Sequence, residues 1–392
     1  MSNAYVVAAV RTPVARAFKG AFRNYRPDDL LADSLRAALA EVPELDPARV
    51  EDVIVGCAMP EAEQGMNVAR IGALLAGLPD SVPGVTVNRF CSSGLQTVAM
   101  AADRIRLGEA DVMIAAGTET MTMVPMMGHK VAMNPRVFSD DNVAIAYGMG
   151  ITAEKVAQEW KVSREDQDQF AYHSHQKAVA AIDAGEFTEI RPVTVTSRAP
   201  GPDGAIRESE TVVDTDEGPR RDTTPEALGK LRTVFDAKGT VTAGTSSQMS
   251  DGAGALILVS ERVVKELNLK PLAVFRGFSV AGVRPEVMGI GPIEAIPRVL
   301  KQTGIGKDDL DWIELNEAFA AQALAVIRNT GLDPDKVNPL GGAIALGHPL
   351  GATGAILSAK LIHGLQRRNQ RYGMVTMCIG TGMGAAGIFE RV

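Results

Sequence analysis

The chain has 392 residues, 46% of them hydrophobic and 5% aromatic, and its net charge is −7. An acidic chain is a poor candidate for general nucleic-acid binding, because that function needs a basic face. No apolar run is long enough to cross a bilayer, and residues 1–14 lack the basic and apolar segments of a signal peptide. Three cysteines in a chain of this length form no disulfide framework, so we expect a protein of the reducing cytoplasm.

Apolar strands alternate with amphipathic helices in the first part of the chain. Such alternation predicts a mostly parallel sheet that is covered by helices on both faces. We expect strands at residues 5–10, 53–57, 84–88 and 112–116, with helices at 27–39, 67–78 and 92–107.

The character of the sequence changes after Gly117. Residues 118–149 have little periodicity, and six of the sixteen methionines fall between 121 and 149. Soft methionine side chains suit a flexible apolar channel, although filling gaps in a core explains them equally well. Helices are expected at 152–160 and 163–184, and residues 200–222 are expected to be an exposed excursion. We interpret residues 118–249 as a loop domain inserted into the first α/β unit.

The α/β pattern resumes at 254–259 and starts again at residue 271. Val87-Asn88 and Val337-Asn338 are each followed by a loop, a helix and an apolar strand, which indicates two similar halves that pack together. We assign residues 1–117 plus 250–270 to the N-terminal half and 271–392 to the C-terminal half. Further strands are expected at 273–280, 312–315, 374–378 and 386–391, and helices at 293–303, 317–329 and from 351 to about 366.

Cys91 lies where the strand at 84–88 meets the helix at 92–107. The free N–H groups and the positive end of the dipole at a helix N-terminus favour a thiolate there. We therefore interpret Cys91 as a nucleophile, with a buried structural thiol as the alternative.

His348 lies in a loop with five glycines, GGAIALGHPLGATG, that leads into a helix. Such a loop allows a ligand to approach the backbone closely. A neutral imidazole beside a thiol is a common way to activate sulphur, so His348 is a candidate base. The alternative is a turn histidine without a catalytic role.

Two further positions follow buried strands. Cys378 precedes the small residues IGTGMG, which leave room for a ligand and offer backbone N–H groups to an oxyanion; the alternative is a core cysteine. Asn316 follows the strand at 312–315, where its side chain could hold a catalytic water or simply cap the next helix. Cys57 also ends a strand but has no such surroundings, and we assign it no role.

These residues fall in four sequence blocks that resemble the thiolases, enzymes of acyl-CoA metabolism, and the resemblance extends over essentially the whole chain. It implies an α/β fold in which two similar βαβ-rich halves pack as a layered αβαβα core. The blocks are NRFCSSG from Asn88, NEAF from Asn316, NPLGGAIALGHPLGATG from Asn338 and CIGTGMG from Cys378.

The resemblance also implies a role for each site residue. Cys91 would form a thioester with the acyl group, and His348 would activate it. Asn316 and His348 would place a water in one oxyanion hole. Cys378 would be the acid and base for the acetyl carbon. The backbone N–H groups of Cys91 and Gly380 would form a second oxyanion hole, and no metal or tightly bound cofactor is implied.

Coenzyme A is implied as a substrate. By resemblance, Arg220 would contact its nucleotide part and Ser247 its pantetheine, although Arg220 in its acidic surroundings could equally be a solvated turn residue. The residues expected to line the CoA and substrate pocket are Met149, Met288, Ala318 and Phe319.

The expected reaction is CoA-dependent cleavage of a 3-ketoacyl-CoA to acetyl-CoA and a shortened acyl-CoA. Biosynthetic acetoacetyl-CoA thiolases carry a histidine where this chain has Gly148, and they have a longer segment after the Gly117 loop. Both differences favour a degradative enzyme. We expect a homodimer, with membership of a β-oxidation complex as an open alternative. The alternatives are an acetoacetyl-CoA thiolase, a carrier-protein-dependent ketosynthase and a non-catalytic acyl-CoA-binding subunit. We expect no nucleic-acid or membrane partner.

Overall fold

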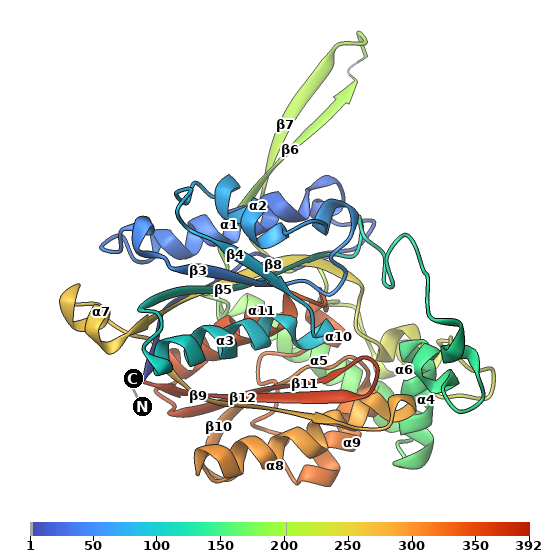
Figure 1. The fold of residues 1–392 in the computed structure, drawn as a ribbon. Coiled ribbons are helices and arrows are strands. Elements are labelled where there is room, and N and C mark those ends of the chain that lie inside the picture. Colours follow the sequence, from blue (N-terminus) through green and yellow to red (C-terminus); the bar gives the residue numbers. More distant parts are fainter. Residues whose placement is uncertain (1–2, 201) are drawn as a thin grey trace.

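A computed structural model describes residues 3–200 and 202–392. The strands form a ten-stranded sheet in the order β10-β11-β12-β9-β1-β8-β5-β3-β4, and β2 (Ala15–Arg16) pairs with β8. Strands β1 (Ala4–Arg11) and β9 (Ala273–Gly282) pair at only two positions, Tyr5 with Val274 and Val6 with Ala273. The sheet divides at this weak junction into two halves that lie one above the other in Figure 1.

Helices separate and cover the two halves of the sheet. Helices α3 (Ser93–Leu107) and α11 (Thr353–Arg367) lie between them, α1 (Pro27–Ala40) and α2 (Val68–Leu75) lie above, and α8 (Gly291–Thr303) and α9 (Ala320–Thr330) lie below (Figure 1). This arrangement is the expected layered αβαβα core. The remaining strands are β3 (Asp52–Gly56), β4 (Gly84–Val87), β5 (Val112–Thr120), β8 (Ser250–Ser260), β10 (Leu310–Leu315), β11 (Tyr372–Ile379) and β12 (Met383–Arg391).

The sheet is mixed, so the prediction of a mostly parallel sheet is wrong. Only the pairs β3–β4, β3–β5 and β10–β11 are parallel, and every other pair on the main path is antiparallel. Two connections explain the difference. Strand β12 follows β11 after a tight turn, which forces an antiparallel pair, and β8 enters the sheet only after the long segment 121–249.

The middle layer is tightly packed because glycines let backbones approach one another. A Cβ atom on Gly354, in α11, would overlap the backbone nitrogen of Leu95 in α3, and one on Gly94 would lie 2.6 Å from the backbone nitrogen of Ala355. Leu95 belongs to the same buried cluster as Phe275 and residues of α11. The first turns of α3 and α11 are therefore fixed side by side, which places the loops before them at the same end of the core.

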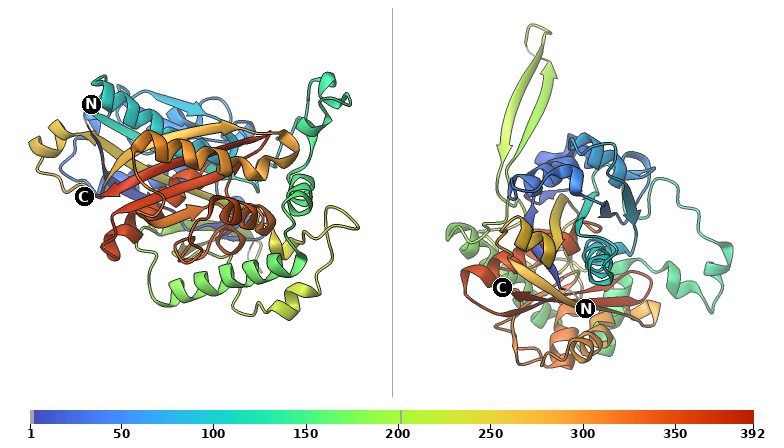
Figure 2. Two further views of the ribbon diagram at one scale, coloured as in Figure 1. Left: turned by 90° about the horizontal axis from the view of Figure 1, so that it is seen from below. Right: turned by 60° about the vertical axis from the view of Figure 1, so that its left-hand side comes forward.

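In the part of the chain that the structure describes, the segment between β5 and β8 contains three α-helices and a hairpin. These elements are α4 (Met149–Glu159), α5 (Arg164–Asp183), α6 (Pro225–Gly229), β6 (Val193–Pro200) and β7 (Ile206–Val213). The β6–β7 hairpin projects away from the core, as Figures 1 and 2 show, and residues 206–212 are exposed as predicted.

The expectation that all of 200–222 is exposed is wrong at residues 213, 216 and 218, which are buried, and residue 201 lies outside the described residues. Asp216 is only 4% exposed and binds the buried guanidinium of Arg11 at 2.7 and 2.9 Å. A buried charge needs such a partner, so the chain returns to the core at this point.

Two short helices complete the fold, α7 (Glu261–Glu266) and α10 (Ala343–Leu346). Among the described residues, no helix has the length and apolar character that spanning a membrane would require.

Candidate active site

Cys91 lies in a short 3-10 helix, Phe90–Ser92, between β4 and α3. Phe90 has a positive φ of 43°, which is unusual for a bulky residue and indicates a sharp turn. The side chain of Asn88 stabilises this turn by accepting the N–H of Phe90 at 2.8 Å. The turn leaves Cys91 partly exposed at the start of α3, as the strand-to-helix pattern predicts.

His348 lies in the loop between α10 and α11, which we call the base loop (residues 347–352). The His348 side chain is 4% exposed. Its Nδ1 lies 2.6 Å from Oγ1 of Thr353, and this hydroxyl also donates to the carbonyl of Pro349 at 2.9 Å. Because the hydroxyl proton is used for Pro349, the oxygen accepts from Nδ1–H, and Nε2 is left as the basic nitrogen.

Asn316 follows β10 and contacts His348 directly. Its Nδ2 lies 3.3 Å from His348 Nε2, which fits donation to an unprotonated nitrogen. Its Oδ1 is buried and has no protein partner, so it is an acceptor available to a water or a ligand. The interpretation of Asn316 as a helix cap is wrong, since α9 begins at Ala320.

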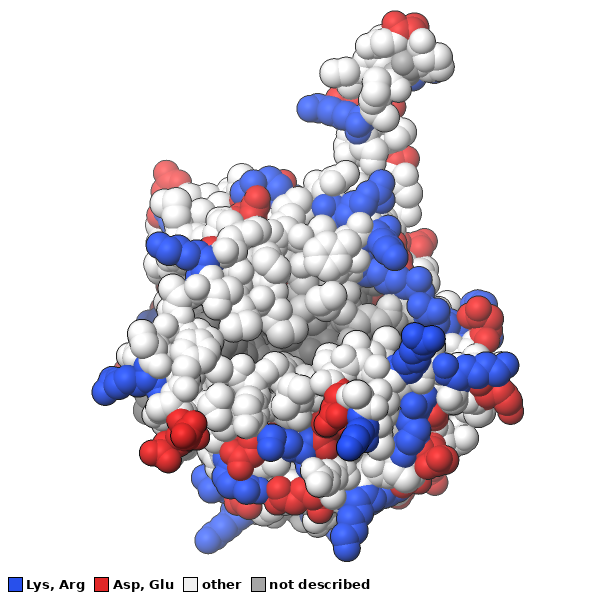
Figure 3. Space-filling view, turned by 90° about the vertical axis from the view of Figure 1, so that its right-hand side faces the viewer, with Lys and Arg blue, Asp and Glu red and all other residues white. Residues whose placement is uncertain are grey.

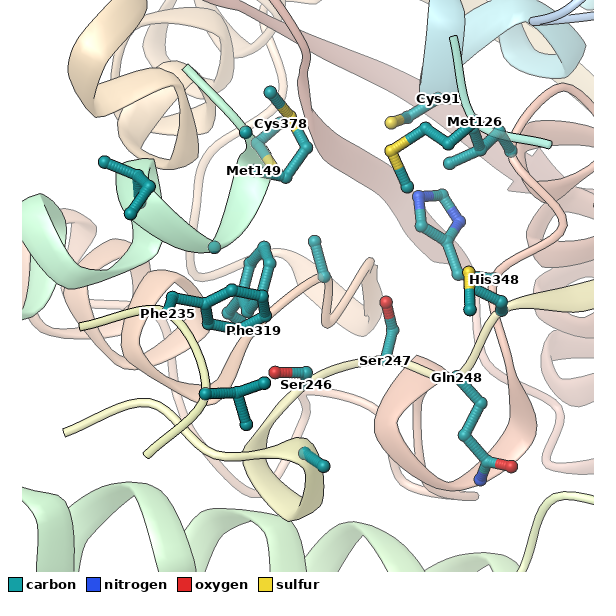
Figure 4. A pocket seen from close by; sticks show the side chains of 18 of the residues that line it. Cys91, Met126, Met149, Phe235, Ser246, Ser247, Gln248, Phe319, His348 and Cys378 are labelled. Atoms are coloured by element: carbon teal, nitrogen blue, oxygen red, sulfur yellow. The ribbon is translucent and has the colours of Figure 1, made fainter. Parts of the chain in front are cut away.

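Cys378 lies near the end of β11, and its exposed fraction is 0%. It lines the same cavity as Cys91 and His348. This cavity, which we call the first cavity, has a volume of about 510 Å³. Figure 4 shows Cys91 and His348 pointing into one part of it, with Cys378 beside Met149 across from them. Two sulphurs and an imidazole from three distant parts of the sequence thus meet in one place.

Burial controls the protonation state of Cys91. It raises the pKa of the Cys91 thiol to about 11, although the backbone N–H groups of Gly380 and Cys91 itself lower that pKa. Desolvation outweighs the effect of the helix N-terminus on the pKa of Cys91, so the thiolate that we expected there is not favoured. The thiol must pass its proton to a base in order to react.

The two partners of Cys91 are also neutral at pH 7. Burial lowers the pKa of the His348 imidazole to about 4, so the ring is free to accept a proton. Burial, and to a lesser degree the nearby Cys91, raises the pKa of the Cys378 thiol. A neutral thiol, a neutral base and a second thiol that holds its proton are arranged for proton transfer.

Five of the six residues expected to contact CoA lie together, and the sixth, Arg220, lies elsewhere. Ser247, Met149, Met288, Ala318 and Phe319 all line the first cavity.

Arg220 does not line the first cavity: it is exposed, and its backbone N–H donates to His175 Nδ1 at 3.2 Å. Figure 3 views the face that carries α4 and α6, and shows an uncharged hollow with Lys and Arg side chains gathered along one side.

A second cavity of about 500 Å³ reaches Cys91 from another direction. It shares Cys91, Met126, Gly148, Met149 and Leu350 with the first cavity. Four of the six methionines between 121 and 149 line it, which favours the predicted apolar channel over a closed core. Its lining also includes Val131, Ile145 and Tyr147, and the four methionines are Met126, Met127, Met133 and Met149.

Both halves of the chain match known family models. The thiolase N-terminal domain matches residues 4–262, and the thiolase C-terminal domain matches residues 269–391. The chain belongs to the thiolase family. It is 52% identical to a 3-ketoacyl-CoA thiolase of Bacillus subtilis over the full length of both chains. It is also 48% identical to the peroxisomal 3-ketoacyl-CoA thiolase 2 of Arabidopsis thaliana, covering 98% of this chain and 83% of that one.

Solved structures of other thiolases share the fold. An acetyl-CoA acetyltransferase of Bacillus anthracis has a TM-score of 0.90 at 38% identity, covering 100% of this chain and 99% of that one. Human mitochondrial 3-ketoacyl-CoA thiolase has a TM-score of 0.89 at the same 38% identity and coverage.

The site of this thiolase includes residues that the sequence reasoning missed. Thr353 fixes the His348 ring, and the Oγ of Ser250 accepts the His348 backbone N–H at 3.2 Å. Phe235 lines the first cavity and packs edge-on against Phe319, with the ring centroids 6.1 Å apart. Of these residues, only Thr353 could have been found from the sequence, because it stands at the start of the helix that follows the base loop.

Proposed function

We propose that this thiolase cleaves 3-ketoacyl-CoA with free CoA, giving acetyl-CoA and an acyl-CoA that is two carbons shorter. The convergence of Cys91, His348 and Cys378 on one cavity carries this proposal. The names of the curated relatives, 3-ketoacyl-CoA thiolases at 52% and 48% identity, agree with it.

In the first half of the reaction, Nε2 of His348 takes the proton of Cys91 and the thiolate attacks the C3 carbonyl of the substrate. The C2–C3 bond then breaks, leaving the acyl group on Cys91 as a thioester and an acetyl-CoA enolate. Cys378 donates its proton to C2 of this enolate, which gives acetyl-CoA. The raised pKa of Cys378 keeps that proton in place until the carbanion develops.

In the second half, the thiol of free CoA gives its proton to the Cys378 thiolate and its sulphur attacks the thioester carbonyl. His348 returns its proton to Cys91, which leaves as the thiol of the resting enzyme, so all three side chains regain their starting protonation states. The negative oxygen of each step needs hydrogen-bond donors. We assign the N–H groups of Cys91 and Gly380, which lie beside the Cys91 sulphur, to the thioester oxygen. We assign the enolate oxygen to the Asn316–His348 pair. A water bound at Asn316 Oδ1 would donate a hydrogen bond to this oxygen.

The first cavity suits the pantetheine arm of CoA, because Ser247 supplies a hydroxyl between apolar walls. The basic side of the hollow in Figure 3 suits the phosphates of the nucleotide. Arg220, which is exposed, stays our candidate contact for the nucleotide. Coenzyme A acts as a substrate in this scheme, and the residues named above perform every proton transfer.

The second cavity favours substrates longer than acetoacetyl-CoA. An apolar space of about 500 Å³ beside Cys91 is within the range of small-molecule pockets, roughly 300–1,000 Å³, and exceeds what a methyl group needs. Each methylene buried there would contribute about 0.8 kcal/mol, or roughly a fourfold rise in kcat/KM.

The test is a rate series over 3-ketoacyl-CoAs of increasing chain length, with CoA as the second substrate. We expect kcat/KM to rise with length until the cavity is full. Activity on the four-carbon substrate alone would make the chain an acetoacetyl-CoA thiolase instead. Tight CoA binding without turnover would identify a non-catalytic binder instead, and activity only with acyl carrier protein would identify a ketosynthase.

We also propose a homodimer in the cytoplasm. Strand β4 ends the sheet, its Val85 is 39% exposed, and its free edge could pair with a second copy of the chain. The three cysteines are unpaired, as a reducing compartment favours. Membership of a β-oxidation complex is a further possibility that co-purification of the native enzyme would test.

A further inference from the structure

Glu119 is a buried acid behind Cys91 that the scheme above does not use. It lies near the C-terminal end of β5 and is 0% exposed. Its Oε2 accepts the backbone N–H groups of Ala58 at 2.7 Å and Gly351 at 2.8 Å. Its Oε1 accepts from the side chain of Gln64 at 2.6 Å and from the N–H of Met59 at 3.3 Å.

These contacts join two loops that come from different halves of the protein. Ala58 follows β3 in the N-terminal half, whereas Gly351 belongs to the base loop, three residues after His348. A single carboxylate oxygen holds both backbones. The approach is so close that a Cβ on Gly351 would lie 2.6 Å from Cys57 Cα and 2.7 Å from Glu119 itself.

Further hydrogen bonds connect Ala58 to the turn that carries Cys91. The carbonyl of Ala58 accepts from Asn88 Nδ2 at 3.0 Å, and Asn88 Oδ1 accepts the N–H of Phe90 at 2.8 Å. Phe90 is the residue with positive φ that directly precedes Cys91. Three hydrogen bonds in series therefore connect Glu119 to the turn that carries Cys91, and a single hydrogen bond connects it to the base loop.

We propose that Glu119 is a positioning residue that fixes the Cys91 turn and the His348 loop relative to each other. This proposal rests on the proposed function, because the separation matters when Cys91 passes its proton to His348. Four N–H groups donate to the carboxylate, two to each oxygen, and the Cys57 thiol lies 3.9 Å from Oε1. Glutamine cannot replace the carboxylate, because its NH₂ group would face two of the N–H donors.

The charge of Glu119 affects the pKa of Cys91, which a residue with a purely structural role would leave unchanged. The titration of Cys91 therefore tests the proposal. The titratable groups nearest Cys91 are Glu119 from β5, His348 from the base loop and Cys378 from β11. Cys57, which follows β3, faces Glu119 with its Sγ 3.9 Å from Oε1, and Glu61 and Lys130 line the second cavity together with Cys91. At neutral pH the imidazole is unprotonated and the Cys378 thiol is protonated, because burial lowers the first pKa and raises the second. Desolvation is the main cause of the raised pKa of Cys91, and the Glu119 carboxylate adds a smaller rise to that pKa, so removing the carboxylate should move the titration of Cys91 slightly to lower pH.

The experiment compares three variants of the full chain. Glu119→Gln removes the charge and breaks part of the network, and Glu119→Asp keeps the charge but shortens the side chain. Glu189→Gln is the matched control, because Glu189 is equally buried and its partner, Arg11 at 3.0 Å, is not part of the site. Thiolysis gives kcat and the KM for CoA, and the pH dependence of iodoacetamide alkylation at Cys91, followed by mass, reports the thiol.

We expect Glu119→Gln to lower kcat by about 100-fold, the loss typical of a displacement near 1 Å, with little change in KM for CoA. Its alkylation profile should move to lower pH. Glu119→Asp should also lower kcat but keep the profile of the native enzyme, and Glu189→Gln should change neither value per folded molecule.

A native kcat and a native alkylation profile in Glu119→Gln would overturn the proposal, and so would equal losses in Glu189→Gln. If Glu119→Gln does not fold, Glu119→Asp decides: an unchanged kcat there contradicts a positioning role. If the native enzyme proves inactive with every 3-ketoacyl-CoA, the proposed function fails, while the alkylation profiles still test the link between Glu119 and Cys91.

Discussion

Thr353 determines which nitrogen of His348 can act as the base. Its hydroxyl donates to Pro349 and accepts from Nδ1–H at 2.6 Å, so the free lone pair is on Nε2. Thr353→Val has nearly the same shape but no acceptor. The Nδ1–H group would then be buried without a partner, at a cost of about 1–3 kcal/mol. The ring would favour the other tautomer, in which Nε2 carries the proton and cannot take one from Cys91.

The same energy gives the expected loss of rate. Since 1.36 kcal/mol corresponds to a factor of ten, acylation of Cys91 should slow by about 5- to 150-fold. Rapid-quench mass spectrometry with acetyl-CoA as the acyl donor measures this step directly. Thr353→Ser keeps the hydroxyl and serves as the control, with near-native rates. Native acylation by Thr353→Val would refute the tautomer assignment and, with it, the basic role of Nε2.

Three further predictions follow from the geometry. Cys378→Ala should still exchange acetyl groups between acetyl-CoA and Cys91 but lose thiolysis by about 10²–10⁴-fold, because only carbon–carbon cleavage needs the second acid. The His348 pKa of about 4 and the Cys91 pKa of about 11 predict alkylation that falls as His348 protonates at low pH and rises as Cys91 ionises at high pH. Gly354→Ala should lower the free energy of unfolding by about 1–3 kcal/mol in urea denaturation, because its Cβ overlaps Leu95.

Each of these has a control or a contradicting outcome. Full thiolysis by Cys378→Ala would remove the acid role. An alkylation rate with one midpoint near pH 8.5, the value of a free cysteine, would contradict the raised pKa of Cys91. Gly229→Ala is the control for Gly354→Ala, because a Cβ at Gly229 meets nothing within 4 Å. Equal stability losses in the two variants would contradict the packing of α3 on α11.

The pH dependence of stability has a definite sign at His348. Burial lowers its folded-state pKa to about 4, below the ordinary value of 6.5, so the unfolded chain binds the proton first. Stability is therefore lost as pH falls from 6.5 towards 4, and it is retained above that window. Urea midpoints of the native enzyme and of His348→Gln at pH 5 and pH 7 measure this contribution.

Local sequence patterns predicted the elements that hold the nucleophile. The apolar spacing of residues 92–107 predicted a helix that is found at Ser93–Leu107, and Gly108 ends it with a left-handed φ of 74°. These features depend on residues that are close together in the chain, so they can be predicted from the local sequence. The grouping of Cys91, His348 and Cys378 was inferred from family resemblance, since their spacing says nothing about distance in space.

Features that depend on distant partners were missed. The sheet is mixed because of pairings such as β1 with β8, which no local pattern encodes. The sequence offered Asn316 as a helix cap. However, the buried side chain of Glu317 accepts hydrogen bonds from Ser174 at 2.6 Å and Asn338 at 2.8 Å, and α9 begins only at Ala320. Glu119 escaped notice because its partners lie near residue 58 and residue 351. The raised pKa of Cys91 likewise reflects burial by the whole fold.

The most direct measurement is the mass of the enzyme after mixing with 3-ketooctanoyl-CoA in the absence of free CoA. The proposed mechanism predicts a hexanoyl adduct that peptide mapping places on Cys91, together with one released acetyl-CoA per site, and discharge of the adduct when CoA is added. No adduct, or an adduct on Cys378 or Cys57 with Cys91 free, would contradict it.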